Sequence, residues 1–243
     1  MEKNNNKIVV IICSIIAVIV GAAGMYLVFH FLPSKTVTNI NKSEKEVTVN
    51  DKGISDAVEK VYDSVVVVET YKSKQQVSSG TGFVYKKDND KAYILTNNHV
   101  ASGGRFYSVR IEDDEEVYTT TEVIKYNSIT DLAVIRINRV LNPIPIYDGK
   151  KKLVRGQKVV AIGSPLGLFN SVSDGIISGF RNINDVDMIQ FTAPISHGSS
   201  GGAVLNMYGE VIGISTAGID SGQNINLAIG YENIRMFTTG FRS

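Results

Sequence analysis

Three residues of this sequence have the types and the order needed for nucleophilic hydrolysis. They are His99, Asp131 and Ser200, and each lies in its own short segment. A serine hydroxyl is a weak nucleophile at neutral pH, so it needs a base within hydrogen-bond reach, and that base needs an orienting group. A histidine can accept and return a proton near neutral pH, and a carboxylate can hold its ring. We therefore predict a hydrolase if these three side chains meet in space.

Each of these residues also has an ordinary interpretation. His99 could be a surface histidine, Asp131 a turn or cap residue, and the glycine-rich segment 198–202 a flexible turn. The segment does not fit a P-loop, because no Gly-Lys-Ser/Thr ending follows it. Its G-x-S-x-G string fits the nucleophile elbow of α/β-hydrolases, but the chain order histidine, aspartate, serine differs from the order in that fold.

The glycines around the serine predict a second part of the same chemistry. Gly198 precedes the two serines, and Gly201 and Gly202 follow them. Glycine permits the tight turns and close backbone approaches that such a segment needs. A turn of this kind can direct the N–H groups of Gly198 and Ser200 into one cavity, with the N–H of Ser199 nearby. We therefore predict an oxyanion hole at residues 198–200.

The elements that must position these residues are mostly strands. Short β-branched and aromatic segments recur with Gly, Asn, Asp and Ser between them, which is typical of an all-β sandwich or barrel. No alternation of strands and helices is visible, which argues against a doubly wound α/β fold. We expect short helices at 54–61 and 232–237 and a hairpin tip at the acidic run 113–116. The clearest predicted strands are 65–68, 82–85, 92–95, 107–111, 132–137, 159–162, 175–177, 188–191, 203–205 and 211–214.

Composition excludes several other classes of protein. The formal net charge is +1, which gives no reason to expect a nucleic-acid partner. The single cysteine, Cys13, lies in the apolar N-terminal stretch, so the rest of the chain has no disulfide and no thiol nucleophile. With three histidines and no cysteine pair, we expect no structural zinc. We expect neither a metal nor a cofactor to take part in the chemistry.

The N-terminus has the pattern of a membrane anchor. Residues 8–29 are almost wholly apolar, and as a helix they would span roughly 33 Å, enough for a hydrocarbon core of about 30 Å. A cleaved signal peptide would have a shorter apolar region and an A-x-A-like site, which does not follow here. We expect a tail at 1–7, a transmembrane anchor at 8–32 and a polar tether at 33–53. Lysines flank both ends of the apolar stretch, so charge alone does not decide its orientation.

Six segments together resemble trypsin-like serine peptidases of the HtrA/DegP type, which have the chymotrypsin fold. The order histidine, aspartate, serine matches that arrangement, and the resemblance covers about residues 54–229. The histidine and serine segments are the specific signals, and the others support them. The segments are SGTGF at 79–83, YILTNNHV at 93–100, TDLAV at 130–134, AIGSPLG at 161–167, VSDGIIS at 172–178 and TAPISHGSSGG at 192–202.

The resemblance implies a fold and a function. The peptidase domain, at 54–243, would contain two six-stranded β-barrels, at about 64–145 and about 155–230. The first would carry His99 and Asp131, and the second Ser200. The implied activity is endopeptidase action on unfolded or damaged polypeptides, with the domain outside the cytoplasm and assembly as a homotrimer. The alternative is a catalytically silent scaffold that keeps this fold and binds peptides at the membrane.

Some residues depart from the family pattern, and others suggest the substrate pocket. His197 stands where proline is usual, and it could be considered as a second base, although packing beside the pocket is the simpler interpretation. Because the chain ends at Ser243, we expect no C-terminal PDZ domain. By analogy the substrate pocket is lined by residues without an acidic group, which favours small or medium aliphatic side chains before the cut. These lining residues are Ile195, Ser215, Thr216, Ala217 and Leu227.

Overall fold

The computed structural model describes residues 52–112, 114–218 and 224–239. The predicted tail and anchor, at 1–7 and 8–32, lie outside these residues, as does the predicted tether up to residue 51. Within the described ranges, no helix combines the length and the hydropathy required to cross a membrane.

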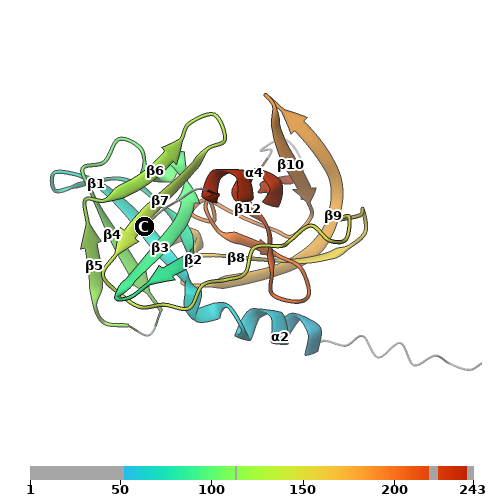
Figure 1. Cartoon of the computed structure of the whole chain (residues 1–243), viewed down its shortest axis with the longest axis horizontal. Helices are drawn as coiled ribbons and strands as arrows, with labels where there is room; N and C mark the ends of the chain where they lie inside the picture. Colours follow the sequence, from blue (N-terminus) through green and yellow to red (C-terminus); the bar gives the residue numbers. More distant parts are fainter. Residues whose placement is uncertain (1–51, 113, 219–223, 240–243) are drawn as a thin grey trace, which may run out of the picture. The chain divides into compact units, whose positions relative to one another are not determined.

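The described chain forms two β-sheets with short helices before, between and after the strands (Figure 1). The elements of the first half are α2 (Lys52–Glu59), η1 (Tyr62–Ser64), β1 (Val65–Lys72), β2 (Gln75–Asp88), β3 (Lys91–Asn97), α3 (Asn98–Ala101), β4 (Phe106–Ile111), β5 (Val117–Thr120), β6 (Val123–Asn127) and β7 (Leu132–Ile137). Those of the second half are β8 (Lys158–Gly163), η2 (Pro165–Gly167), β9 (Ser171–Ile183), β10 (Val186–Phe191), β11 (Ala203–Leu205), β12 (Val211–Gly218), β13 (Asn226–Gly230) and α4 (Tyr231–Thr238).

The second sheet is the predicted barrel, whereas the first differs from the prediction. Strands β8 to β13 close into a six-stranded barrel in the order β10-β13-β12-β11-β8-β9. The first sheet has seven strands, in the order β5-β4-β1-β2-β3-β7-β6, and its two edge strands do not pair. The expectation of a six-stranded first barrel was therefore wrong. The edge strands β5 and β6 have only four and five residues and are for the most part incompletely buried, so they give a weak strand signal in the sequence.

All the predicted strands lie within observed strands, and both predicted helices are confirmed as α2 and α4. The acidic run lies, as expected, between two paired strands, since β4 and β5 are antiparallel with Arg110 opposite Val117.

Runs of consecutive apolar residues reflect burial on both faces of a strand. In β1, Val66 and Val68 belong to the core inside the first sheet, while Val65 belongs to a second core shared with the barrel. The same alternation occurs in β8, where Val160 faces the shared core and Val159 the inside of the barrel. Successive side chains of a strand point to opposite faces, so a strand buried on both sides is apolar throughout.

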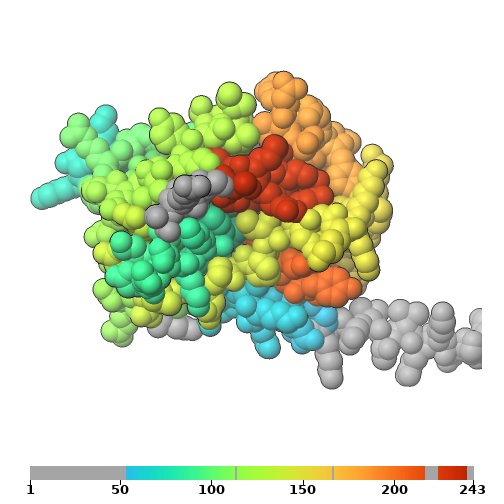
Figure 2. Space-filling model, viewed as in Figure 1, coloured from blue at the N-terminus to red at the C-terminus, as the bar shows by residue number. Residues whose placement is uncertain are grey.

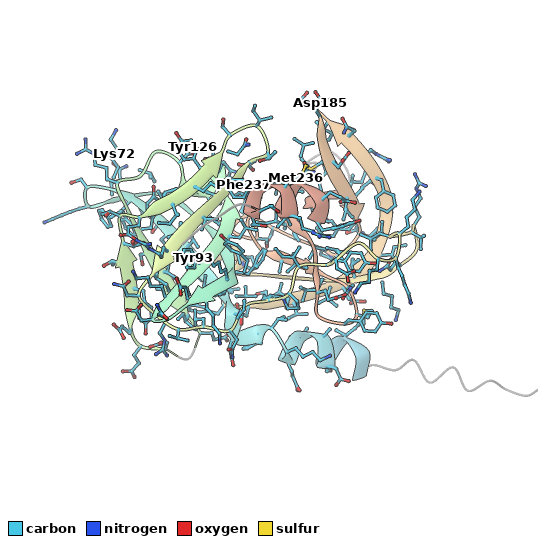
Figure 3. All side chains as sticks on the ribbon, in the orientation of Figure 1. Lys72, Tyr93, Tyr126, Asp185, Met236 and Phe237 are labelled. Atoms are coloured by element: carbon cyan, nitrogen blue, oxygen red, sulfur yellow. The ribbon has the colours of Figure 1, made fainter. Side chains whose placement is uncertain are left out.

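The C-terminal helix joins the two sheets. On the face shown in Figure 2, α4 (red) lies between the first sheet (green) and the barrel (yellow and orange). Ile234 and Phe237 of this helix are part of the shared core. Lys125 of β6 donates a hydrogen bond to the carbonyl of Phe237 at 2.5 Å, and its ammonium lies 4.8 Å from the centre of that ring. Figure 3 labels Phe237 at the end of α4 next to the first sheet.

Candidate active site

The pairing of two strands brings the predicted histidine and aspartate together. Strand β3 is antiparallel to β7, and Asn97, the last residue of β3, is opposite Leu132, the first residue of β7. His99 follows β3 in the short helix α3, and Asp131 immediately precedes β7. The end of one strand and the start of its antiparallel neighbour lie side by side, so residues far apart in sequence become neighbours here.

Hydrogen bonds fix the geometry of the histidine–aspartate corner, which consists of residues 97–99 and Asp131. The His99 ring Nδ1 lies 2.7 Å from Asp131 Oδ2, and the His99 backbone N–H donates to Asp131 Oδ1 at 2.8 Å. The Asp131 carbonyl accepts bonds of 3.0 Å from the Asn98 N–H and from the Asn97 side-chain amide. Asp131 has a φ of 52°, in the left-handed region that aspartate tolerates better than most residues. This turn aims the carboxylate at the histidine.

Thr216 links this corner to the predicted nucleophile. Its hydroxyl donates to Asp131 Oδ2 at 2.9 Å, although Thr216 belongs to β12 of the barrel and Asp131 to the first sheet. The Ser200 hydroxyl donates to the Thr216 carbonyl at 3.2 Å. Across the described ranges, Ser200 Oγ has no hydrogen bond to His99. The three predicted residues therefore share one neighbourhood, with Ser200 turned toward Thr216.

The pKa of Asp131 lies below its ordinary value. Burial is the largest single influence and favours the neutral form. The hydrogen bonds from the ring and the backbone N–H of His99, the charge of the imidazolium and the bond from the Thr216 hydroxyl together outweigh it. Asp131 is therefore ionised at neutral pH, as a carboxylate that orients a histidine must be.

Glycines shape the nucleophile turn, residues 198–202, which carries the predicted nucleophile Ser200. Gly198 and Gly201 have φ values of 94° and 86°, which side chains other than glycine rarely adopt. A Cβ on Gly201 would lie 2.0 Å from the carbonyl oxygen of Thr81, so no other residue fits against β2 at this point. The turn is closed by bonds from the Ser199 N–H to Ser196 and from the Gly202 N–H to Ser199.

Two backbone donors of this turn remain available. Among the described residues, no acceptor is bonded to the N–H of Gly198 or to that of Ser200. The Ser199 N–H, by contrast, donates to the Ser196 carbonyl at 2.9 Å. Of the predicted oxyanion-hole residues, Gly198 and Ser200 thus have free donors beside the Ser200 hydroxyl, and Ser199 does not.

The predicted pocket residues are only partly brought together. Ile195 and Ser215 line one cavity of about 150 Å³, together with Ser199 of the nucleophile turn. Thr216 and Leu227 are not among its lining residues, and the side chain of Ala217 lies outside the described part of the chain. No acidic residue lines this cavity.

The cavities of largest volume elsewhere in the described residues do not include the predicted site. A larger cavity of about 370 Å³, between the β9–β10 hairpin and the start of α4, contains none of the predicted site residues. Within the described ranges, no group of His, Cys, Asp and Glu side chains could hold a metal ion.

Two residues contribute to this site in ways that were not predicted. Thr216 was predicted only as a pocket residue, and its bond to Asp131 was not foreseen. Thr81, within the SGTGF segment, contacts the nucleophile turn through its hydroxyl and its backbone. Both contacts join the first sheet to the barrel, so no local sequence pattern predicts them. The only signal was the position of Thr81 between two glycines.

Comparisons with known proteins identify a family. The family described as trypsin-like peptidase domain matches residues 80–214. The Serine protease Do-like HtrB of Bacillus subtilis is 31% identical over 89% of this chain and 55% of its own length. The Serine protease Do-like HtrA of the same organism is 36% identical over 65% of this chain and 38% of its own.

The chain is also similar to a solved structure. The serine endoprotease from Yersinia pestis superposes with a TM-score of 0.67 and 32% identity, covering 75% of this chain and 64% of that one. The chain thus spans about half of the HtrB relative and less of the HtrA relative. From the family match and these relatives, the chain belongs to the trypsin-like serine peptidases and, among them, to the HtrA or Do-like group.

Proposed function

We propose that the protein is a serine endopeptidase in which Ser200 is the nucleophile, His99 the general base and Asp131 the residue that orients the base. The observation that carries this proposal is one continuous set of hydrogen bonds. The Ser200 hydroxyl donates to the Thr216 carbonyl, and the Thr216 hydroxyl donates to the Asp131 carboxylate. That carboxylate is in turn bonded to the His99 ring. With Nδ1 held by the carboxylate, Nε2 is the ring nitrogen left to accept a proton.

The residues then have defined roles in the reaction. The Ser200 hydroxyl turns from the Thr216 carbonyl to His99 Nε2, gives up its proton and attacks the peptide carbonyl carbon. Catalytic hydrogen bonds are often absent or long before substrate binds. The N–H groups of Gly198 and Ser200 stabilise the developing oxyanion. The imidazolium then protonates the leaving amine, and His99 activates a water molecule that hydrolyses the acyl-enzyme.

A fluorophosphonate probe tests this function. The full wild-type chain should be labelled covalently near neutral pH, and Ser200→Ala should abolish the labelling. Ser199→Ala, in the adjacent residue, is the matched control and should still be labelled. A wild-type protein that never reacts with the probe would favour the silent scaffold, in which Ser200 keeps its bond to the Thr216 carbonyl.

The proposed substrates are unfolded or damaged polypeptides with an aliphatic residue before the cut. The small cavity beside Ser199, lined by Ile195 without an acidic group, supports this preference. A peptide-library cleavage profile should show Val or Ala before the cut. Strong cleavage after Arg or Lys would contradict it. A reduced, unfolded protein should be degraded much faster than the same protein in its folded form.

We also propose that the peptidase is anchored in a membrane through residues 8–32, with its catalytic domain outside the cytoplasm. The apolar composition of the N-terminal stretch supports the anchor, and the resemblance supports the location. In fractionated cells, the full chain should resist alkaline extraction from membranes, and externally added protease should reach the catalytic domain of intact spheroplasts. The homotrimer rests on the resemblance alone, and light scattering of the full chain in detergent tests it.

A further inference from the structure

Thr81 occupies an unusual place between the two halves of the molecule. It lies in β2 of the first sheet and is fully buried. Its hydroxyl donates to the carbonyl of Gly198 at 2.7 Å, and its backbone N–H donates to the carbonyl of Ser200 at 2.8 Å. Both acceptors belong to the nucleophile turn of the barrel. One residue of the first sheet thus binds the turn on either side of the Ser199–Ser200 peptide.

The hydroxyl of Thr81 also accepts a hydrogen bond. The Ser164 N–H, at the end of β8, donates to it at 2.8 Å. The Thr81 carbonyl in turn accepts a bond of 2.6 Å from the hydroxyl of Thr96, three residues before His99. All the polar groups of Thr81 therefore contribute to contacts around the proposed site. An apolar side chain of the same shape would leave the Gly198 carbonyl and the Ser164 N–H without this partner.

The surrounding backbone leaves little room for the turn to shift. A Cβ on Gly80 would lie 2.9 Å from the Ser200 carbonyl oxygen, and a Cβ on Gly201 would lie 2.0 Å from the Thr81 carbonyl oxygen. The turn and β2 are thus in direct backbone contact. In such close packing the side chain of Thr81 determines which way the neighbouring peptide groups face, because a rotated peptide would lose its partner.

We propose that Thr81 is a positioning residue for the nucleophile turn. Its hydroxyl holds the 198–199 peptide and its N–H holds the 200–201 peptide. These two peptides flank the one that carries the Ser200 N–H, and the first also adjoins the one that carries the Gly198 N–H, so both donors keep their direction toward the substrate carbonyl. Through Ser164 it also ties the turn to the loop that follows β8. This inference rests on the proposed function, because it assigns Thr81 a part in the same reaction. Thr81 itself touches no reacting atom.

Substitution of the hydroxyl tests this role. In the full chain, Thr81→Val keeps the shape and removes the hydrogen bonds, whereas Thr81→Ser keeps them. We expect Thr81→Val to lower kcat about 10²-fold, because small displacements of catalytic groups have effects of this size. KM should change less than about twofold. Thr81→Ser should restore kcat to within about threefold of the wild type. Because an unfolded fraction would also lower the apparent kcat and leave KM unchanged, kcat is expressed per folded enzyme, with the folded fraction taken from thermal unfolding of each variant. A purely structural role would then leave kcat of Thr81→Val at the wild-type value.

Ser108→Ala is the matched control. It also removes a buried hydroxyl from the first sheet, where Ser108 donates to Glu69 at 3.3 Å, away from the nucleophile turn. Its kcat should equal that of the wild type. If Thr81→Val retains wild-type kcat, or if Thr81→Ser is as impaired as Thr81→Val, the inference is wrong.

Two further results keep the test decisive. If Thr81→Val does not fold, Thr81→Cys replaces it, since a thiol is a weak donor of similar size. Serine should then give a clearly higher kcat than cysteine, and equal values would overturn the inference.

Fluorophosphonate labelling separates this inference from the proposed function. A reactive wild type with an equally reactive Thr81→Val overturns only the role of Thr81, whereas an unreactive wild type overturns both.

Discussion

The histidine–aspartate corner and the nucleophile turn differ in how completely their polar groups are paired. The Asp131 carboxylate accepts bonds from His99 and Thr216, and its carbonyl accepts from Asn97 and Asn98. The nucleophile turn keeps two N–H groups without an acceptor among the described residues, and its serine is bonded to a carbonyl. The hydrogen bonds to Asp131 are thus formed before substrate arrives, whereas in the proposed reaction the two N–H groups of the turn receive their acceptor from the substrate.

The two regions also depend on different parts of the fold. Pairing of β3 with β7 inside one sheet builds the histidine–aspartate corner, and only Thr216 reaches it from the barrel. The nucleophile turn is held from both halves, because Ser215 of β12 bonds to Gly201 and Gly202, and Thr81 of β2 bonds to Gly198 and Ser200. Pre-organised charge at the base and open donors at the oxyanion site are what a hydrolase needs.

Loss of the base should have the largest effect. His99→Ala should lower kcat on the order of 10⁶-fold, as removal of a triad histidine does elsewhere. His197, exposed and three residues before Ser200, is the matched control, and His197→Ala should keep wild-type kcat. An active His99→Ala together with an inactive His197→Ala would make His197 the base instead. A rate that is flat from about pH 5 to about pH 9 would contradict any histidine base.

Neutralising the orienting carboxylate should have the next largest effect. Asp131→Asn keeps the shape but cannot hold the imidazole in the same tautomer, so we expect kcat to fall about 10⁴-fold. Asp114→Asn is the control, since Asp114 also has a pKa below its ordinary value but lies in the hairpin between β4 and β5. Steady-state kinetics on one peptide substrate give both values. A loss of less than about tenfold in Asp131→Asn would show that this corner matters little.

Loss of the hydrogen bond from Thr216 of the barrel to Asp131 should have a moderate effect on kcat. Thr216→Val removes the hydroxyl that donates to Asp131. Hydrogen bonds to charged groups contribute about 1.5–3 kcal/mol, part of which is needed in the transition state. We expect kcat to fall about tenfold, with Thr216→Ser near the wild type. If Thr216→Val and Thr216→Ser were equally active, the Thr216 hydroxyl would have no part in catalysis.

The smallest expected effect is on stability in acid. The pKa of Asp131 is lowered on folding, so its ionised form stabilises the folded state above the ordinary aspartate value of about 3.9. That contribution is lost as the pH falls through the lower folded value. Denaturant unfolding of the wild type and Asp131→Asn should therefore show the wild type losing relative stability from about pH 4 downward. A difference that stays constant from about pH 5 to about pH 2 would contradict the lowered pKa.

The sequence predicted the parts of the molecule that depend on local pattern. Strands buried on both faces, such as β1 and β8, are apolar throughout and were expected. The edge strands β5 and β6 were not, because four or five incompletely buried residues give too short a pattern to be distinguished from a loop. The three reactive residue types and their order were visible in the sequence. The hydrogen bonds of Thr81 and Thr216 were not, because each spans the two sheets and depends on how they pack.

A crystal structure of the full chain after reaction with a small fluorophosphonate would show whether Ser200, His99 and Asp131 act together. We expect a phosphorus–oxygen bond to Ser200 Oγ, with a phosphonyl oxygen about 2.7–3.1 Å from both the Gly198 and the Ser200 nitrogen atoms. His99 should remain bonded to Asp131, with Nε2 facing the adduct. An adduct on another residue, or a phosphonyl oxygen in solvent with the His99 ring out of reach of Ser200, would contradict the account.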